Sequence, residues 1–323
     1  MLTRREWLAL TAGAGAAFAL DPRILLAHQS NLIMRAVPST GEQLPVIGLG
    51  SSATFSQVAR SEDKSALTEV FKTMVELGAK VFDTAPSYGA SEQVAGDIAA
   101  ELGITNKIFW ATKVNVARGG PADPAAARAQ IEDSFKKLKT PKIDLIQVHN
   151  LGDVPTQLGI LKELKKEGRI RYIGVTTTSD RQYGQLESIM RNEPLDFIGV
   201  DYALDAREVE ATILPLAIER KIGVLVYVPL GRNRLFRRVE GKELPEWAKD
   251  FGATSWAQFF IKYVVAHPAV TTVTPATSQA KHMAENIAAG SGALPDEAMR
   301  KRMAELIDAL PAPPGRGRGA GAG

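Results

Sequence analysis

Eight short apolar runs, separated by longer amphipathic segments, constrain the fold of this chain more than any other feature of its sequence. The runs lie at residues 46–49, 81–82, 108–111, 144–148, 172–175, 197–200, 224–228 and 270–273. The segments between and after them lie at residues 64–77, 91–102, 124–138, 156–167, 181–191, 208–220, 253–266 and 279–289. Strict alternation of strand and helix predicts a parallel sheet.

The amphipathic segments have the period of helices. In residues 124–138, Ala127, Ile131, Phe135 and Leu138 recur at intervals of three and four, which places them on one buried face. Eight strand–helix units without a linker-like interruption favour a closed (β/α)8 TIM barrel over an open doubly wound sheet. We expect one α/β domain over residues 31–310.

The two ends of the chain are set apart from this domain. Arg4 and Arg5 precede residues 8–20, an uncharged stretch rich in Ala and Gly. This layout in residues 1–30 predicts an export signal of the twin-arginine type, with transient binding to the translocase and a periplasmic or otherwise exported product; without a signal the protein is cytoplasmic. The apolar stretch is shorter than the about 20 residues of a membrane span. Residues 311–323, rich in Pro, Gly and Arg, are expected to be a flexible tail.

Charge and composition narrow the class of partner. The formal net charge is +3 over 323 residues, and Lys and Arg are spread along the chain, so no nucleic-acid partner is expected. No set of His, Cys and carboxylate residues has metal-ligand spacing, so no metal site is expected either. A small-molecule ligand is the favoured partner, and the sequence leaves the oligomeric state open.

Four polar residues stand at the ends of three consecutive predicted strands. Asp83 and Tyr88 follow the second strand, Lys113 ends the third and His149 ends the fourth. In a (β/α)8 barrel the C-terminal ends of the strands carry the active site, so these side chains are expected to share one mouth. A lone His at a strand end is more often structural. The conjunction of all four favours chemistry.

This set of side chains suits the reduction of a carbonyl group by hydride. Hydride addition leaves negative charge on oxygen, and a free Tyr with a pKa of about 10 gives up a proton only modestly at neutral pH. A neighbouring ammonium lowers that pKa. We therefore expect Tyr88 to be the acid, Lys113 to tune its pKa, Asp83 to orient Lys113, and His149 to be a donor to the substrate oxygen or a proton relay.

At these residues the sequence resembles the aldo-keto reductase superfamily. The family's Asp, Tyr, Lys and His tetrad matches Asp83, Tyr88, Lys113 and His149 in order, local sequence and approximate spacing, and the resemblance covers residues 37–310. It implies a carbonyl reductase or alcohol dehydrogenase that uses NADP(H), with NAD(H) left open. The implied substrates are aldehydes and ketones, sugar-like ones included.

The resemblance also implies how the nucleotide is held. Tyr227 matches the aromatic residue that stacks on the nicotinamide, with a core aromatic as the alternative. Residues 275–286 match the loop and helix start that hold the adenosine phosphate. The matched contact positions are Gly50, Ser51, Asp83, Asn150, Thr176, Thr177, Tyr227, Pro229, Leu230, Thr277, Ser278, Gln279, Lys281, Glu285 and Asn286.

Three departures from the family pattern affect the cofactor. Thr176 and Thr177 stand where many members have a Ser–Asn pair, and Gly199 stands where they have a Gln. The carboxamide is therefore expected to be held differently or less firmly. Ser278 stands where an Arg often binds the 2′-phosphate, which leaves Lys281 as the nearby cation.

Two other functions stay open at this point. A nucleotide-binding accessory or regulatory module with little turnover is compatible with the departures, although the intact tetrad argues against it. A sugar isomerase or lyase would need a metal or a Schiff-base lysine. Lys113 is the candidate lysine, but adjacent Asp83 disfavours a neutral amine. If the protein is exported, we expect it to bind its cofactor beforehand and retain it.

Overall fold

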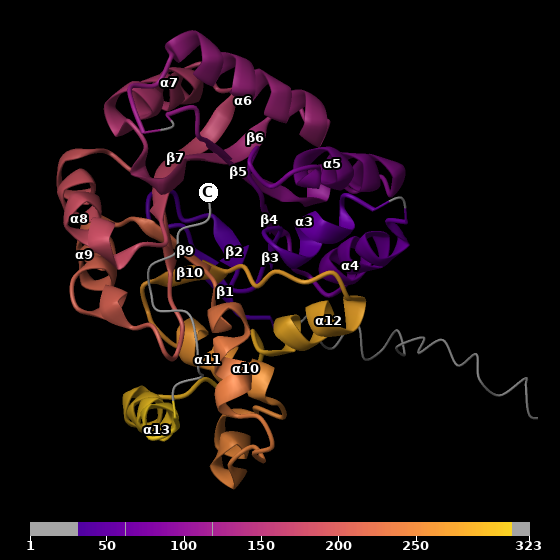
Figure 1. The fold of residues 1–323 in the computed structure, drawn as a ribbon, viewed down its shortest axis with the longest axis vertical. Coiled ribbons are helices and arrows are strands. Elements are labelled where there is room, and N and C mark those ends of the chain that lie inside the picture. The colour runs from indigo at the N-terminus through magenta and orange to yellow at the C-terminus, as the bar shows by residue number, and fades with distance from the viewer. Residues whose placement is uncertain (1–31, 62, 118, 312–323) are drawn as a thin grey trace, which may run out of the picture.

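The computed structural model describes residues 32–61, 63–117 and 119–311 and contains an eight-stranded sheet surrounded by helices (Figure 1). The predicted export signal and residues 312–323 of the predicted tail lie outside the described residues. The strands of the sheet are β3 (Leu49–Gly50), β4 (Val81–Asp83), β5 (Phe109–Val114), β6 (Ile143–Val148), β7 (Ile170–Thr177), β8 (Phe197–Asp201), β9 (Gly223–Tyr227) and β10 (Val270–Val273).

The sheet is parallel throughout and closes on itself. Each strand from β3 to β10 pairs with the next in chain order. Gly48 N donates to Val273 O at 2.8 Å, and Val273 N donates to Val46 O at 2.8 Å. A parallel bridge joins Gly50 to Ala276. These contacts close the ring between the first and last strands, so the predicted (β/α)8 barrel is confirmed.

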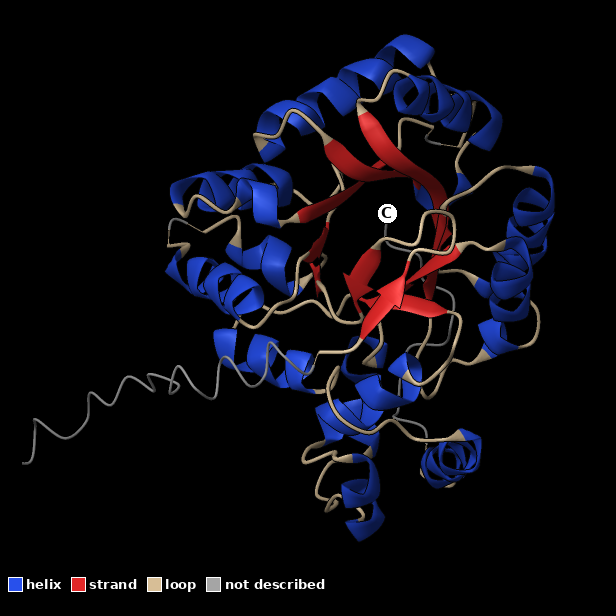
Figure 2. Cartoon of the chain, turned by 180° about the vertical axis from the view of Figure 1, so that it is seen from behind, coloured by secondary structure: helices blue, strands red, loops and turns tan. Residues whose placement is uncertain are grey.

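The helices form a ring outside the strands (Figures 1 and 2). The α-helices are α3 (Thr54–Val58), α4 (Ser65–Glu76), α5 (Ser91–Glu101), α6 (Pro124–Leu138), α7 (Val154–Lys166), α8 (Tyr183–Asn192), α9 (Ile213–Arg220), α10 (Arg234–Arg238), α11 (Trp256–Val265), α12 (Ala280–Ala288) and α13 (Glu297–Asp308). The 3-10 helices are η1 (Thr105–Lys107), η2 (His149–Leu151), η3 (Asp180–Gln182), η4 (Glu208–Glu210), η5 (Gly231–Asn233) and η6 (Glu246–Phe251). No helix among the described residues is both long enough and apolar enough to span a membrane.

Helix α6 shows why the sequence places some elements well. Its bounds equal the predicted residues 124–138, because Asp123 caps it by accepting from Ala125 N and Pro124 occupies its first turn. Predicted segment 208–220 is instead divided into η4 and α9. Helices α3, α10 and α13 were not predicted, and the segment with α10 and η6 projects beyond the ring (Figures 1 and 2).

The barrel interior is a packed core rather than a pore. Because successive side chains of a strand point to opposite faces, one set of apolar residues fills the interior while another packs beneath the helices. The interior cluster consists of Val37, Leu44, Val81, Phe109, Ala111, Leu145, Tyr172, Phe197, Leu225 and Tyr227.

A β-hairpin closes the N-terminal end of the barrel. Strands β1 (Met34–Ala36) and β2 (Gln43–Pro45) pair antiparallel, and the interior cluster includes Val37 and Leu44 from this hairpin. The sequence does not predict the hairpin, because strands of three residues show no apolar period.

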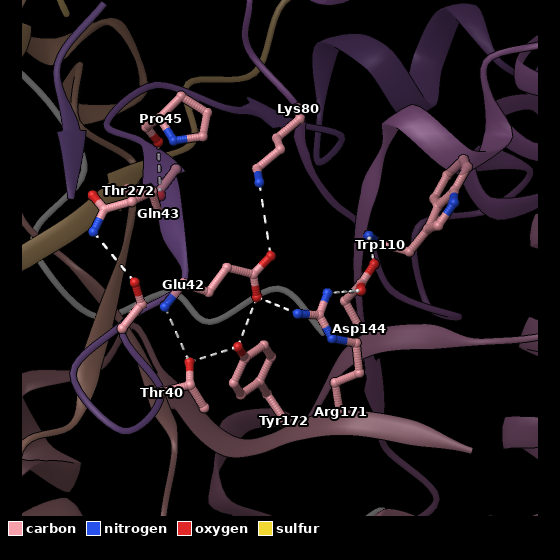
Figure 3. Close-up of polar contacts among 11 residues, drawn as sticks. Thr40, Glu42, Gln43, Pro45, Lys80, Trp110, Asp144, Arg171, Tyr172 and Thr272 are labelled. Atoms are coloured by element: carbon pink, nitrogen blue, oxygen red, sulfur yellow. Dashed lines mark hydrogen bonds and ion pairs between the residues drawn. The ribbon is translucent and has the colours of Figure 1, made fainter. Parts of the chain in front are cut away.

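A group of charged and phenolic side chains fastens this hairpin to the barrel (Figure 3). We call Glu42, Lys80, Asp144, Arg171 and Tyr172 the N-terminal polar network. Glu42 accepts from the Tyr172 hydroxyl at 2.7 Å and pairs with Arg171. Arg171 also contacts Asp144 Oδ1 at 2.6 Å, and Lys80 Nζ lies 3.7 Å from Glu42. Every member therefore has an oppositely charged or hydrogen-bonding neighbour.

Candidate active site

Strand alternation directs two of the predicted catalytic side chains into the C-terminal end of the barrel. In β5, Phe109 and Ala111 belong to the interior cluster, and Lys113 is the next residue on that face. In β4, Val81 belongs to the cluster and Asp83 follows it. The apolar interior thus ends in a layer that carries opposite charges.

Lys113 and Asp83 form a buried ion pair. Lys113 Nζ donates to Asp83 Oδ2 at 2.8 Å, to Asp83 Oδ1 at 3.0 Å and to the Thr84 carbonyl at 2.8 Å. The two charged side chains are only 1% and 4% exposed. Burial is the largest single effect and disfavours the ammonium, but Asp83, Tyr88 and Glu92 together raise the pKa of Lys113. A charged, fully engaged amine argues against the Schiff-base interpretation.

Tyr88 lies in the loop after β4, close to this pair. Lys113 Nζ is 5.2 Å from the centre of the Tyr88 ring. Burial raises the pKa of the Tyr88 phenol, and the opposing effect of Lys113 is smaller. The lowered pKa that the sequence predicts for Tyr88 is wrong in its net direction, because burial removes water from the phenol. The phenol is therefore protonated at neutral pH.

His149 begins η2 directly after β6 and meets Tyr88 edge to face, with ring centres 5.9 Å apart. Burial, followed by the nearby charge of Lys113, lowers the pKa of His149 to about 3. Its Nδ1 has no hydrogen-bond partner among the described residues. The imidazole is thus neutral at physiological pH, with one ring nitrogen available as donor and the other as acceptor.

Tyr227 places a second phenol against the same ion pair. Its hydroxyl lies 2.7 Å from Gln147 Oε1 and 3.1 Å from Asp83 Oδ1, and the residue is 8% exposed. The sequence does not predict that this phenol points at Asp83, and Gln147 is not among the predicted site residues. The available signal was a polar residue at an inward position of β6, two residues before His149.

Two glycines make room for these side chains. A Cβ atom at Gly199 would lie 2.4 Å from Tyr227 Cε2 and 2.6 Å from its hydroxyl oxygen. At Gly174, a Cβ would lie 3.2 Å from Gln147 Cγ and 2.3 Å from the Phe197 carbonyl. The departure from the family pattern at Gly199 therefore has a local cause, because the Tyr227 phenol fills the space of a side chain there.

The threonine pair of β7 is also held inside the protein. Thr177 Oγ1 contacts Gln182 Oε1 and accepts from Ser179 N at 3.1 Å, and Gln182 Nε2 donates to the Asn150 carbonyl at 3.2 Å. Thr176 is buried beside it. The hydroxyl of Thr177 is thus already engaged, whereas the side chain of Asn150 is exposed at the mouth.

Two hydroxyls at the strand ends have no partner. Ser51 Oγ, after β3, and Thr84 Oγ1, after β4, are buried and make no hydrogen bond among the described residues. The backbone is tight at this point, since a Cβ at Gly50 would lie 2.5 Å from the Thr274 carbonyl. Buried polar atoms without partners are costly and are expected where a ligand completes the hydrogen bonding.

The remaining predicted contact positions lie around the start of α12 and after β9. No side chain caps α12, and Thr277 Oγ1 accepts from Gln279 N at 3.1 Å. Uncapped N–H groups at the N-terminus of a helix favour an anion. Exposure differs among the predicted contacts: Gln279 and Lys281 are exposed, Ser278, Glu285 and Leu230 are half-buried, and Pro229 and Asn286 are buried.

Backbone strain is concentrated at this end of the barrel. Nine non-glycine residues among those described have positive φ, and two of them, Lys139 and Lys221, are helix C-caps. The other seven all follow strands β3, β6 or β9, and they include Val228 (φ 54°) directly after Tyr227. Positive φ is unfavourable for a β-branched residue and tends to persist at functional sites.

The chain is similar to known proteins in sequence and in fold. The model of the aldo/keto reductase family matches residues 46–307. Aldo-keto reductase YhdN of Bacillus subtilis is 32% identical over 210 residues, an alignment that spans 62% of each chain. A probable aldo-keto reductase 1 of Glycine max is 28% identical over 285 residues, covering 75% of this chain and 78% of the relative.

Solved structures share the fold. An aldo-keto reductase from Klebsiella pneumoniae in complex with NADPH superposes with a TM-score of 0.72 at 22% identity. The match covers 90% of this chain and all of the Klebsiella protein (100%).

Proposed function

The chain belongs to the aldo/keto reductase family, and from that premise we propose that it reduces an aldehyde or ketone to an alcohol with NADPH. The observation that carries this proposal is the convergence of Tyr88, Lys113, Asp83 and His149 at the C-terminal end of the barrel. The first three are linked by ion-pair and ring contacts, and His149 packs on Tyr88.

The side chains support a division of roles in the reaction. A reduced nicotinamide, when bound, supplies the hydride that forms the new C–H bond. Tyr88, protonated at neutral pH, gives its proton to the carbonyl oxygen as the C=O π bond breaks, so the substrate gains one hydride and one proton. Neutral His149 donates a hydrogen bond to the same oxygen. Lys113 then stabilises the Tyr88 phenolate until solvent restores the proton.

The strand ends and α12 suit a nicotinamide nucleotide. The unpaired hydroxyls of Ser51 and Thr84 offer hydrogen bonds beside Asp83, and the uncapped start of α12 suits the adenosine phosphate. Exposed Lys281 is the nearby cation for a 2′-phosphate, with Ser278 as a hydroxyl donor. The NADPH bound by the Klebsiella relative supports the same choice of cofactor here.

Nucleotide binding followed by turnover tests this function. We would titrate the purified protein with NADPH and NADH by fluorescence and then follow nicotinamide oxidation with a panel of aldehydes and ketones. Tyr88→Phe should keep nucleotide binding and lose at least about 100-fold in kcat/KM. Tyr263→Phe is the matched control, since that phenol contacts Glu210 away from the barrel mouth. Full activity of Tyr88→Phe would overturn the assignment of the acid.

A nucleotide-binding module with little turnover is the second candidate. It is favoured by the internal engagement of the Thr177 hydroxyl and by the missing side chain at Gly199, both at positions where the family pattern binds the carboxamide. Tight NADPH binding without turnover of any carbonyl compound would support this candidate over the reductase.

We also propose that residues 1–30 direct export of the folded protein with its nucleotide already bound. The paired Arg4 and Arg5 before an uncharged stretch support this proposal. Replacing both with Lys should keep the protein in the cytoplasm on fractionation. Recovery of the parent protein from the periplasm without nucleotide would refute the retained-cofactor proposal.

A further inference from the structure

The Asp83–Lys113 pair is close to two phenols rather than one. Lys113 Nζ lies 5.2 Å from the ring centre of Tyr88 and 5.0 Å from that of Tyr227. Only Tyr227 also contacts the carboxylate, with its hydroxyl 3.1 Å from Asp83 Oδ1. The two rings therefore stand in different relations to the same ion pair.

The three shortest hydrogen bonds of the ammonium go to acceptors other than Tyr88 in this arrangement. Lys113 has three N–H groups, and they donate to Asp83 Oδ1, to Asp83 Oδ2 and to the Thr84 carbonyl. The bond to Oδ1 is the longest of the three at 3.0 Å, and Oδ1 is the oxygen that Tyr227 also approaches. If the Tyr227 hydroxyl donates to Asp83 Oδ1, Lys113 can give up its own bond to Oδ1 without leaving this buried carboxylate oxygen unpaired.

We propose that Tyr227 is a positioning residue. Its hydroxyl donates a hydrogen bond to Asp83 Oδ1 in place of Lys113, and one N–H of Lys113 is then free to turn toward the Tyr88 oxygen. The proposal rests on the proposed function, in which Tyr88 is the acid. A charge-assisted hydrogen bond from Lys113 stabilises the Tyr88 phenolate more than an ammonium directed elsewhere. Tyr227 thus acts on the reaction through Asp83 and Lys113.

Three neighbours hold the Tyr227 hydroxyl where this exchange can occur. Gln147 Oε1, at 2.7 Å, competes with Asp83 for the single phenol proton. Gly199 leaves the space that the ring occupies. Val228, directly after Tyr227, has a strained positive φ that restrains the end of β9. The hydroxyl therefore has two acceptors within reach and little freedom to leave them.

The other groups that face Tyr88 come from four elements. Asp83 lies on β4, Lys113 on β5, His149 at the start of η2 and Arg232 in η5. Neither His149 nor Arg232 makes a hydrogen bond to Tyr227 among the described residues. Removal of the Tyr227 hydroxyl should therefore reach Tyr88 through Asp83 and Lys113.

Fluorine NMR of the full protein labelled with fluorotyrosine tests the proposal without substrate or nucleotide. The chain has six tyrosines, and the Tyr88 signal is the one that disappears in Tyr88→Phe. Fluorotyrosine is more acidic than tyrosine, which keeps its titration within milder pH values. In Tyr227→Phe, which retains the ring, the Tyr88 pKa should rise by about half a unit or more. A pKa within about 0.2 units of the parent would overturn the proposal.

Three further variants distinguish an effect of the hydroxyl from an effect of the ring and from a folding defect. Gly199→Ala should displace the phenol and raise the Tyr88 pKa as Tyr227→Phe does. Gln147→Met removes the competing acceptor of the Tyr227 proton and should lower the Tyr88 pKa. Tyr263 is a buried phenol that donates to Glu210, and Tyr263→Phe should leave the Tyr88 pKa unchanged. If Gln147→Met and Tyr227→Phe shift the pKa in the same direction, the exchange at Oδ1 does not occur.

NADPH titration separates this proposal from failure of the proposed function. Tyr227→Phe should bind NADPH within about twofold of the parent, because a stacking ring is retained. A shifted Tyr88 pKa in a protein that turns over no carbonyl compound would leave the positioning role intact and reject the reductase. A loss of about tenfold or more in NADPH affinity without a pKa shift would assign the hydroxyl to cofactor binding and reject the positioning role.

Discussion

The two ends of the barrel use the same kinds of side chain in opposite ways. At the N-terminal end, Glu42 and Arg171 are partly exposed, Asp144 is buried, and each is paired (Figure 3). At the C-terminal end, Asp83 and Lys113 are buried, and hydroxyls nearby have no partner. Seven of the nine non-glycine residues with positive φ among those described follow strands, at the C-terminal end. The charged side chains at the N-terminal end are paired with one another. The C-terminal end has buried hydroxyls without partners among the described residues, and it has a strained backbone.

The largest expected effect comes from removing the buried charge. Lys113→Met should lower kcat/KM for carbonyl reduction by about 100-fold or more, because the phenolate of Tyr88 loses its neighbouring cation. It should also cost about 3–5 kcal/mol of unfolding free energy, since Asp83 is left buried and unpaired. Steady-state kinetics and urea unfolding measure the two effects. Near-parent activity would mean that the C-terminal pair is structural, like the network at the other end.

The stability of the folded protein is expected to depend on pH through His149. The pKa of His149 is about 3 in the folded chain, below its ordinary value of 6.5. The unfolded chain therefore binds a proton first as pH falls, and stability decreases between pH 6.5 and about 3, by up to about 1.4 kcal/mol per pH unit. His267, lowered to about 4, contributes over a similar window. His149→Gln should remove close to half of this slope in unfolding experiments, and an unchanged slope would show that His149 is not protected in the folded state.

The N-terminal network should respond more weakly and without an effect on catalysis. Arg171→Met removes the partner of Glu42 and Asp144 and should cost about 1–2 kcal/mol, because Glu42 keeps access to water and buried Asp144 keeps its hydrogen bond from Trp110 N. We expect kcat/KM to stay within about twofold of the parent, given the separation of the network from the reacting end. A large loss of activity would show that the two ends are coupled through the strands.

The smallest effect is expected from relieving strain. Val228→Gly should stabilise the protein by up to about 1 kcal/mol, since glycine adopts φ near 54° without steric cost, although its flexibility in the unfolded chain opposes the gain. Lys139→Gly, at a helix C-cap with φ 50°, is the matched change away from the mouth. Thermal unfolding compares them. If only Val228→Gly also lowers kcat/KM, the strain at the mouth is functional.

The sequence predicted the features that depend on periodicity and local chemistry. The eight strands and helix α6 follow from apolar spacing and from the Asp123–Pro124 start. The convergence of Asp83 and Lys113 follows from their positions at strand ends.

Features that depend on burial and on packing across the barrel could not be predicted. The net rise in the pKa of Tyr88 depends on how much water is excluded from the phenol. The contact of Tyr227 with Asp83 and Gln147 joins residues from β9, β4 and β6 and requires the space at Gly199. No local pattern records which side chain fills such a space.

The hairpin of β1 and β2 has a consequence for kinetics. Because it seals one end of a solid core, any molecule that reaches Lys113 must arrive and depart through the opposite end. Two ligands that share a single route cannot exchange independently. If the proposed cofactor and substrate share this route, we expect the one that lies deeper to enter first and leave last.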